Sequence, residues 1–257
     1  MGSRLLVVQP SDVAPAERLG DWLADAGADL TLRRPATDGV PESLEGVDGV
    51  VCMGGEMGAN DDADYPWLAA LRWLLADAVA RRMPVLGVCL GGQLLAKATG
   101  GAVRRAVDGP EAGTLLVAKR DAAGHDPLFA QLPMTPDVIQ FHHDEIHRLP
   151  PGATLLASSP RHANQAFRVG VAGYGLQCHI ETSPATVLSW ASRDAGGAFP
   201  PRQLDPDHLE QVHADIEQAW RPVAARFVAL AAGDLAADDL SPAVGPGDRP
   251  ALHLLED

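Results

Sequence analysis

The stretch Pro84-Val85-Leu86-Gly87-Val88-Cys89-Leu90-Gly91-Gly92-Gln93 joins an apolar run to the pattern Gly-x-Cys-x-Gly. Residues 94–98 continue it with helical character, so the stretch predicts a strand, a sharp turn and a helix, with a thiol at the turn. The same order is typical of the G-x-S-x-G elbow of hydrolases, with cysteine in place of serine. We therefore expect Cys89 to be a nucleophile.

The residues around Cys89 suit that chemistry. Gly87 and Gly91 place no side chain against the turn or an approaching substrate. A sulfur at a helix N-terminus feels the positive end of the helix dipole, which favours the thiolate. The amide of Leu90 can point at a developing oxyanion. The alternative is a buried structural cysteine, which is the more common interpretation of an isolated one.

Composition narrows the class of protein. The chain has 257 residues, 46% of them hydrophobic, and its net charge of −14 disfavours nucleic acid or an anionic membrane surface as a partner. No apolar run reaches the ~18 residues that span a membrane. Cys52, Cys89 and Cys178 form no even disulfide framework, so the simplest expectation is a reducing cytoplasm.

Motifs for metals and cofactors are missing from the sequence. It contains no pair of cysteines spaced as CxxC, no HExxH, no Walker-type loop and no GxGxxG after a strand. The expectation is therefore an enzyme without a metal or a cofactor.

The first part of the chain predicts alternating strands and helices, and hence a mostly parallel sheet covered on both faces. Within the helix at 66–82, Trp73 lies off the apolar face, and we expect it to pack under a loop. Residues 54–62 follow a strand at the sheet edge where ligands bind in open α/β sheets, although a flexible loop is the alternative. The expected strands are 4–9, 30–33 and 49–53, and the other helix is 14–26.

The second part of the chain carries shorter patterns. A helix is expected from Ser183-Pro184 to about 192 and a long one over 207–232, whereas 233–257 has the composition of a loosely ordered acidic arm. We thus expect one domain over 1–192, with 193–257 packed on it or trailing from it. The expected strands are 113–118, 136–145, 153–158, 164–169 and 174–181.

His179 and Glu181 stand two residues apart on the last of these strands, where alternate side chains share a face. A cysteine nucleophile needs a base, and the base needs a group that orients it. A core or loop histidine is the alternative for His179 alone. Spacing does not bring Cys89 and His179 together, but neighbouring parallel strands that end at one sheet edge would do so.

Three motifs resemble the class I (triad) glutamine amidotransferases, in particular stand-alone members similar to the amidotransferase domain of GMP synthase. The motifs are Met-Gly-Gly at 53–55, Gly-Val-Cys-Leu-Gly-Gly-Gln at 87–93 and Gln-Cys-His-Ile-Glu at 177–181. The resemblance covers about residues 5–190. It implies a flavodoxin-like α/β fold and hydrolysis of the glutamine side-chain amide through a γ-glutamyl thioester.

The same resemblance implies roles for individual residues. Cys89 would be the nucleophile, His179 the general base and acid, and Glu181 its orienter. The amides of Gly55 and Leu90 would form the oxyanion hole.

Glutamine would be bound by a further set of residues in this interpretation. Gln93 occupies a position of the family's C-x-G-x-Q pattern, and His142 and Asp144 match its H-x-D near the substrate's α-carboxylate, for which a solvated loop is the alternative. Gly54 and Phe141 complete the expected binding residues.

The chain departs from the family pattern at two prolines. Ile180 replaces the proline of Q-F-H-P-E, and Glu56 replaces the proline that usually follows Gly-Gly. Cys178 replaces the phenylalanine of Q-F-H-P-E. We expect Cys178 to be a small core residue that points away from the active face.

Three functions compete. The first is a glutaminase that delivers ammonia to a separate synthetase subunit. The second is a self-contained hydrolase of γ-glutamyl amides or peptides with the same Cys-His-Glu triad. The third is a non-catalytic binding or regulatory module, against which the intact triad argues.

Overall fold

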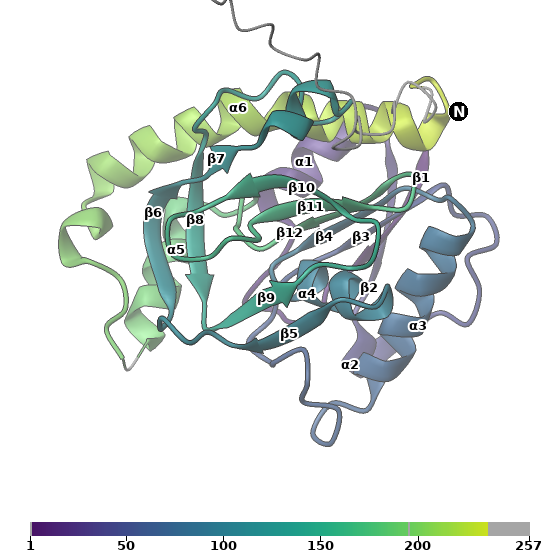
Figure 1. The fold of residues 1–257 in the computed structure, drawn as a ribbon, viewed down its shortest axis with the longest axis horizontal. Coiled ribbons are helices and arrows are strands. Elements are labelled where there is room, and N and C mark those ends of the chain that lie inside the picture. The colour runs from purple at the N-terminus through teal and green to yellow at the C-terminus, as the bar shows by residue number, and fades with distance from the viewer. Residues whose placement is uncertain (1, 195, 236–257) are drawn as a thin grey trace, which may run out of the picture.

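The computed structural model describes residues 2–194 and 196–235. Its main sheet has the strand order β2-β1-β3-β4-β12-β11-β10-β7, and two small antiparallel ribbons, β5-β9 and β6-β8, lie beside it (Figure 1). The main-sheet strands are β1 (Arg4–Val8), β2 (Asp29–Arg33), β3 (Gly49–Cys52), β4 (Val85–Val88), β7 (Ala118–Lys119), β10 (Thr154–Ser158), β11 (Ala166–Val169) and β12 (Gly173–Leu176). The ribbon strands are β5 (Ala102–Arg105), β6 (Glu111–Leu116), β8 (Asp137–His142) and β9 (Asp144–Arg148).

Helices cover both faces of the main sheet. Alternate residues of a strand point to opposite faces, and in β1 the residues on both faces are apolar. Leu5 and Val7 of β1 pack with the apolar sides of α1 and α6, whereas Leu6 and Val8 pack with α3 and α4. The strands are thus buried on both faces. The helices are α1 (Glu17–Asp25), α2 (Pro35–Asp38), α3 (Trp67–Ala80), α4 (Leu90–Ala98), α5 (Pro184–Arg193) and α6 (Pro206–Ala232), with short 3-10 turns η1 (Asp121–His125) and η2 (Pro201–Leu204).

The order of the strands brings two distant segments together. Strands β2, β1, β3, β4 and β12 run parallel, and β11, β10 and β7 continue the sheet antiparallel. β4 pairs directly with β12, with Val88 opposite Leu176. The expected mostly parallel sheet with helices on both faces is confirmed. The condition for bringing Cys89 near His179, neighbouring strands that end at one edge, is also met.

Some local expectations were wrong. The expected strand 174–181 ends at Leu176, so His179 and Glu181 lie beyond it, and His179 instead forms an isolated antiparallel bridge with Ile139. The strand expected over 136–145 is two strands, β8 and β9, that break at His143. Trp73 is 60% exposed rather than covered by a loop.

The long C-terminal helix α6 lies along the domain on the face that α1 shares (Figure 1). Its N-cap is Asp205, whose carboxylate accepts a hydrogen bond from the amide of His208, and its C-cap is Gly233, with φ of 77°. The indole of Trp220 donates to the carbonyl of Asp137 on β8. We infer that residues up to 235 belong to one domain with the rest. The greater part of the expected acidic arm, residues 236–257, lies outside the described residues.

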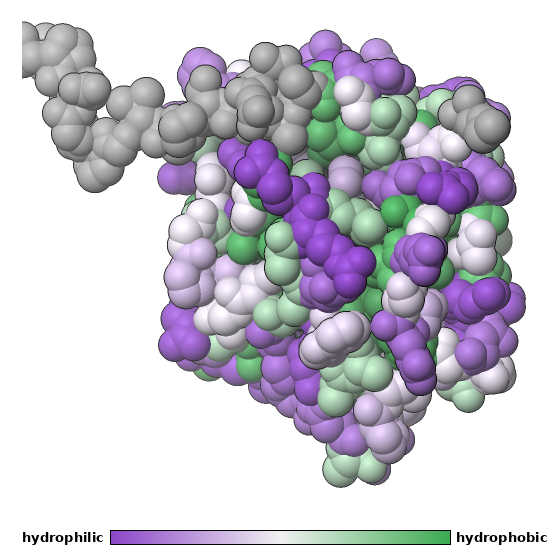
Figure 2. Space-filling model, turned by 90° about the vertical axis from the view of Figure 1, so that its right-hand side faces the viewer, coloured by the Kyte–Doolittle hydropathy of each residue, from purple (hydrophilic) through white to green (hydrophobic). Residues whose placement is uncertain are grey.

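The surface on the α3 side mixes hydrophilic and hydrophobic residues (Figure 2). Over residues 2–194 and 196–235, no helix combines the length and the apolar character needed to cross a bilayer.

Substitution of Gly91 by alanine should destabilise the fold by about 1–3 kcal/mol, because overpacking a rigid contact costs that much. A Cβ at this position would lie 2.0 Å from the carbonyl oxygen of Cys52, where α4 packs on β3. Gly124→Ala is the control, since a Cβ there meets nothing within 4 Å. Urea unfolding of both variants measures the difference; equal midpoints would contradict the packing argument.

Candidate active site

Cys89 occupies the turn between β4 and α4 with a strained backbone. Its φ is 51° and its ψ −109°, values that a non-glycine residue rarely adopts. The amide of Cys89 donates to the carbonyl oxygen of Leu176, at 2.8 Å, which ties the turn to β12. The side chain lines a cavity at the N-terminus of α4. This is the geometry of a nucleophile elbow.

Two neighbouring glycines are needed for the elbow because the backbone passes too close for a side chain. A Cβ on Gly87 would lie 2.5 Å from the carbonyl of Gly91, and one on Gly92 would lie 2.4 Å from the carbonyl oxygen of Leu176. The helix therefore starts directly against the sheet. Leu90 is its first residue, so its amide has no acceptor within the helix.

His179 and Glu181 form a buried pair next to Cys89. Nδ1 of His179 lies 2.7 Å from Oε1 of Glu181, and the other carboxylate oxygen accepts from the amide of Ile180. Both side chains are almost fully buried. Although the chain has left β12, the backbone of His179 is held by two hydrogen bonds with Ile139 of β8.

The electrostatics of His179 favour its charged form. Burial alone would lower its pKa, but the charges of Glu181 and Cys89 and the hydrogen bonds to them raise it well above the ordinary value. Burial raises the pKa of the Cys52 thiol to about 12. Burial also raises the pKa of the Cys178 thiol. Cys178 is fully buried in the core, as expected.

A cavity of about 560 Å³ opens in front of Cys89 and His179. Gly54 lies against both, because a Cβ there would be 3.3 Å from Cε1 of His179 and 3.6 Å from Cβ of Cys89. Gly55 and Leu90 line the cavity and lie close to each other. Of the described residues, those that line the cavity are Val13, Ala14, Gly55, Glu56, Met57, Gly58, Cys89, Leu90, Gln93, Arg105, Phe141, His142, His143, Asp144, His179, Trp190, Arg193, Asp194 and Gly196.

The other expected binding residues occupy different positions around this cavity. Gln93 is held by its amide nitrogen, which donates to Gln177 Oε1 and to the carbonyl of Asp144. The carboxylate of Asp144 pairs with Arg105 at 3.6 Å. Phe141 stacks on Trp190, with ring centroids 5.6 Å apart.

His142 borders the cavity, but its imidazole points elsewhere. Its side chain is 1% exposed, with Nε2 3.4 Å from Glu111 and Nδ1 2.9 Å from the carbonyl oxygen of Asp144. Ligand atoms of Glu111, His142 and His162 lie within 4.8 Å of one another, and this group is a candidate for holding a cation.

Sequence reasoning missed three side chains of the site. Trp190 packs its ring 4.7 Å from the ring of His179 and donates to the carbonyl of Val13. Arg105 and Arg193 bring positive charge to the cavity. The spacing of Val187 and Trp190, the two buried residues of α5, could have pointed to a buried Trp190, but no local pattern points to either arginine.

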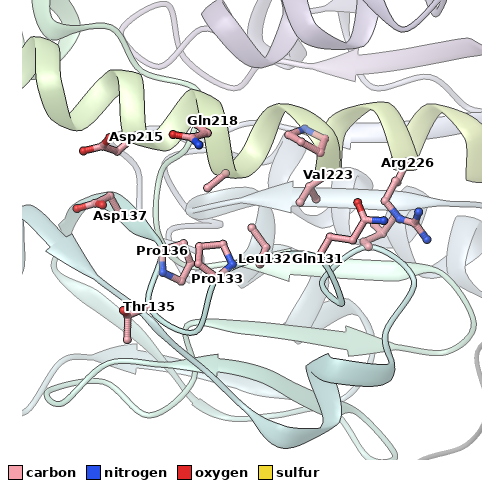
Figure 3. A pocket seen from close by; sticks show the side chains of 13 residues that line it. Gln131, Leu132, Pro133, Thr135, Pro136, Asp137, Asp215, Gln218, Val223 and Arg226 are labelled. Atoms are coloured by element: carbon pink, nitrogen blue, oxygen red, sulfur yellow. The ribbon is translucent and has the colours of Figure 1, made fainter.

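A second cavity of about 550 Å³ lies between α6 and the segment 128–137 (Figure 3). Among its described lining residues are Asp137, Asp215 and Arg226, but no cysteine or histidine. Burial and the nearby Asp215 raise the pKa of Asp137. Of the two cavities, the first is therefore the one whose described lining includes a cysteine and histidines.

Comparison with known proteins agrees with this geometry. A family model described as "Glutamine amidotransferase class-I" matches residues 17–187. The chain belongs to the class-I glutamine amidotransferases. Among solved structures, a glutamine amidotransferase from Methylobacillus flagellatus superposes with a TM-score of 0.78 at 31% identity, covering 89% of this chain and 95% of the other.

Curated relatives within this family carry two kinds of name. Gamma-glutamyl peptidase 4 of Arabidopsis thaliana is 31% identical over 201 residues, which cover 77% of this chain and 76% of the relative. A glutamine-hydrolyzing GMP synthase subunit of Haloarcula marismortui is 33% identical over 162 residues, 63% of this chain and 77% of the relative. The expected family and its fold are confirmed, and the members are hydrolases or amidotransferases.

Substitution of Glu181 by glutamine should lower the pKa of His179, because a charge that raises it is removed. In the wild type the pair's stabilisation is fully present below the unfolded pKa of ~6.5 and is lost as the pH rises through the raised folded value. Histidine-selective NMR titration measures the shift. Glu210→Gln, an exposed carboxylate on α6, is the control. An unchanged His179 titration in Glu181→Gln would contradict the electrostatic assignment.

Proposed function

We propose that this protein hydrolyses the side-chain amide of glutamine through a γ-glutamyl thioester on Cys89. The observation that carries the proposal is the juxtaposition of the strained Cys89 elbow with the buried His179–Glu181 pair at one cavity. In this proposal Cys89 is the nucleophile, His179 the general base and acid, and Glu181 its orienter.

The acylation step follows from these roles. The sulfur of Cys89 attacks the amide carbon, a C–S bond forms, and the electron pair of the carbonyl moves onto oxygen. His179 gives its proton to the departing nitrogen as the C–N bond breaks, so ammonia leaves and the thioester remains. The raised pKa of His179 supports this step, because the imidazolium is the proton donor.

Deacylation reverses the proton flow. His179 removes a proton from water, the hydroxide oxygen attacks the thioester carbon, and the C–S bond breaks to release glutamate and the free thiol. Glu181 stabilises the imidazolium through its 2.7 Å contact with Nδ1, which leaves Nε2 to exchange the proton. The net reaction converts glutamine and water into glutamate and ammonia.

The oxyanion of both steps would be stabilised by backbone amides. We assign this role to Leu90 and Gly55, which line the cavity close to each other. Leu90 is the stronger of the two assignments, since the first amide of a helix has no acceptor within that helix.

The γ-glutamyl group would lie along the cavity wall. Because the amide nitrogen of Gln93 already donates to Asp144 and Gln177, its amide oxygen is suited to a substrate ammonium group. Gly54 permits close approach, and Phe141 supplies an apolar side. Asp144 completes the expected set. His142 would not contact the substrate directly, because its Nδ1 donates to the carbonyl oxygen of Asp144.

The ammonia would pass to a separate synthetase, as the resemblance to the GMP synthase relative of Haloarcula marismortui suggests. Hydrolysis of γ-glutamyl peptides is the second candidate. It is favoured by the likeness to Gamma-glutamyl peptidase 4 and by a cavity of about 560 Å³, larger than free glutamine needs. Arg193 on the lining could pair with a peptide carboxylate, whereas Arg105 already pairs with Asp144.

Cys89→Ser should reduce turnover by at least ~10³-fold while keeping the fold, because the nucleophile is lost but the volume is conserved. A glutamine-analogue electrophile such as diazo-oxo-norleucine should add once to the wild type, at Cys89, and excess glutamine should block it. Peptide mapping by mass spectrometry locates the adduct. Cys52→Ala is the control and should keep the adduct; labelling at Cys52 or Cys178 instead would overturn the assignment.

The two candidate functions separate in a substrate comparison. For a glutaminase we expect slow release of ammonia from glutamine by the pure protein, which a synthetase partner increases. For a γ-glutamyl peptidase we expect kcat/KM for γ-glutamyl dipeptides to exceed that for glutamine by tenfold or more without a partner. Glutamate release measured side by side decides between them, with Cys89→Ser as the blank.

A further inference from the structure

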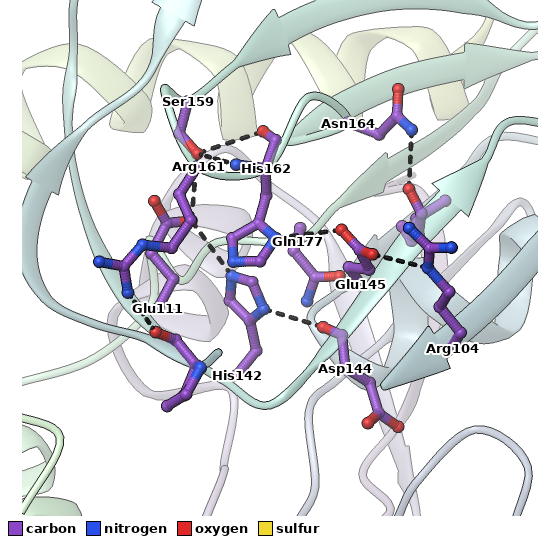
Figure 4. Close-up of polar contacts among 12 residues, drawn as sticks. Arg104, Glu111, His142, Asp144, Glu145, Ser159, Arg161, His162, Asn164 and Gln177 are labelled. Atoms are coloured by element: carbon purple, nitrogen blue, oxygen red, sulfur yellow. Dashed lines mark hydrogen bonds and ion pairs between the residues drawn. The ribbon is translucent and has the colours of Figure 1, made fainter. Parts of the chain in front are cut away.

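A buried group of three side chains lies behind the cavity wall. Glu111 of β6 stands directly opposite His142 of β8 in the antiparallel register, and His162 comes from the turn between β10 and β11 (Figure 4). All three residues are buried, and one ligand atom of each lies within 4.8 Å of the others. No spacing motif could reveal them, because they lie on three separate segments.

The hydrogen bonds fix which ring nitrogens face one another. Nδ1 of His142 lies 2.9 Å from the carbonyl oxygen of Asp144, and a carbonyl can only accept, so this nitrogen carries the proton. Nδ1 of His162 lies 3.2 Å from Oε2 of Glu145. The same argument places its proton there, because Arg104 donates to the other oxygen of Glu145, so that this carboxylate accepts at both oxygens.

Both Nε2 atoms are consequently lone-pair acceptors in the neutral rings. Each is buried and lacks a hydrogen-bonding partner among the described residues. Nε2 of His142 is 3.4 Å from Oε2 of Glu111, an ion-pair distance that does not meet hydrogen-bond geometry. Three electron-pair donors thus face one buried point, an arrangement that is costly unless a cation or proton lies between them.

We propose that Glu111, His142 and His162 bind a divalent transition-metal ion. Zinc is the metal that fits this set of ligands. Two imidazole nitrogens and one carboxylate are typical zinc ligands, and bonds of ~2.0–2.1 Å put tetrahedral ligand atoms about 3.4 Å apart. Glu111 and His142 already have that separation. A small movement of the third side chain completes the set, with water as the fourth ligand.

The surroundings match those of metal-binding histidines. Such residues donate their second ring nitrogen to a carboxylate or a backbone carbonyl, which orients the ring and raises its basicity. His162 does so to Glu145, and His142 to Asp144. Glu111 is oriented in turn by Ser159 and Gln165, which both donate to Oε2.

The ion would connect β6, β8 and the β10–β11 turn. Its influence on the cavity would pass through the carbonyl of Asp144, which accepts from both His142 and Gln93. We assign it a structural role for this wall, since the imidazole of His142 does not face Cys89. The proposal is therefore independent of the reaction assigned to the cavity.

The test uses the full chain with Cys89→Ala, which removes the cavity thiol as a competing ligand. After treatment with a chelator and dialysis, titration with Zn²⁺ followed by calorimetry and elemental analysis should give a single ion per chain. Glu111→Gln and His162→Gln should each weaken binding by ~100-fold or more, and Glu145→Gln by ~10–100-fold. The exposed His147→Asn on β9 is the matched control and should bind like its parent.

Two results would overturn the proposal: no Zn²⁺ bound by the folded parent protein, or equal affinity in the parent and in both ligand variants. If a ligand variant does not fold, X-ray absorption of the Zn²⁺-loaded parent decides. Nitrogen and oxygen scatterers at ~2.0–2.1 Å with imidazole multiple scattering are expected. A sulfur scatterer at ~2.3 Å would place the ion on Cys52 or Cys178 and refute the site.

Discussion

The parallel pairing of β4 with β12 is the constraint on which the site depends. It sets Val88 opposite Leu176, so the next residues of both strands leave the sheet at one edge. The hydrogen bond from the amide of Cys89 to Leu176 fixes the turn of one strand to the end of the other. Cys89 and His179 are 90 positions apart in the sequence. Without this strand pairing, no local interaction would bring them together.

The close packing of α4 on the sheet requires a strained backbone at Cys89, and the contacts of α4 with the sheet hold that conformation. A positive φ at Cys89 costs of order 1–3 kcal/mol and persists only where the surroundings enforce it. Here the helix lies against β3 and β12 at glycine contacts, and a wider approach would withdraw the thiol from the cavity. The strain and the reactive position of the sulfur therefore have the same cause.

Local pattern predicted most elements of the fold, because buried strands and amphipathic helices have clear periodicities. The local pattern failed where hydrogen bonds to a distant segment replaced the pairing of neighbouring sheet strands. His179 and Glu181 lie close together although β12 ends at Leu176, because Ile139 of β8 holds the backbone of His179. Arg105 and Arg193 could not be predicted at the cavity, because their positions depend on how β5 and α5 pack. The family resemblance indicated Cys89, His179 and Glu181, but it does not specify the direction of each side chain.

Strand alternation explains the different surroundings of Phe141 and His142, two expected binding residues that are adjacent on β8. Adjacent residues of a strand point to opposite faces, so both side chains cannot enter the same cavity. Phe141 packs on Trp190 beside His179, whereas His142 turns toward Glu111. Gln140 shares the face of His142 and donates to Gln165, which in turn donates to Glu111. One strand thus provides the apolar wall of the cavity on one face and a buried polar network on the other, and the β8–β9 turn couples them through the carbonyl of Asp144.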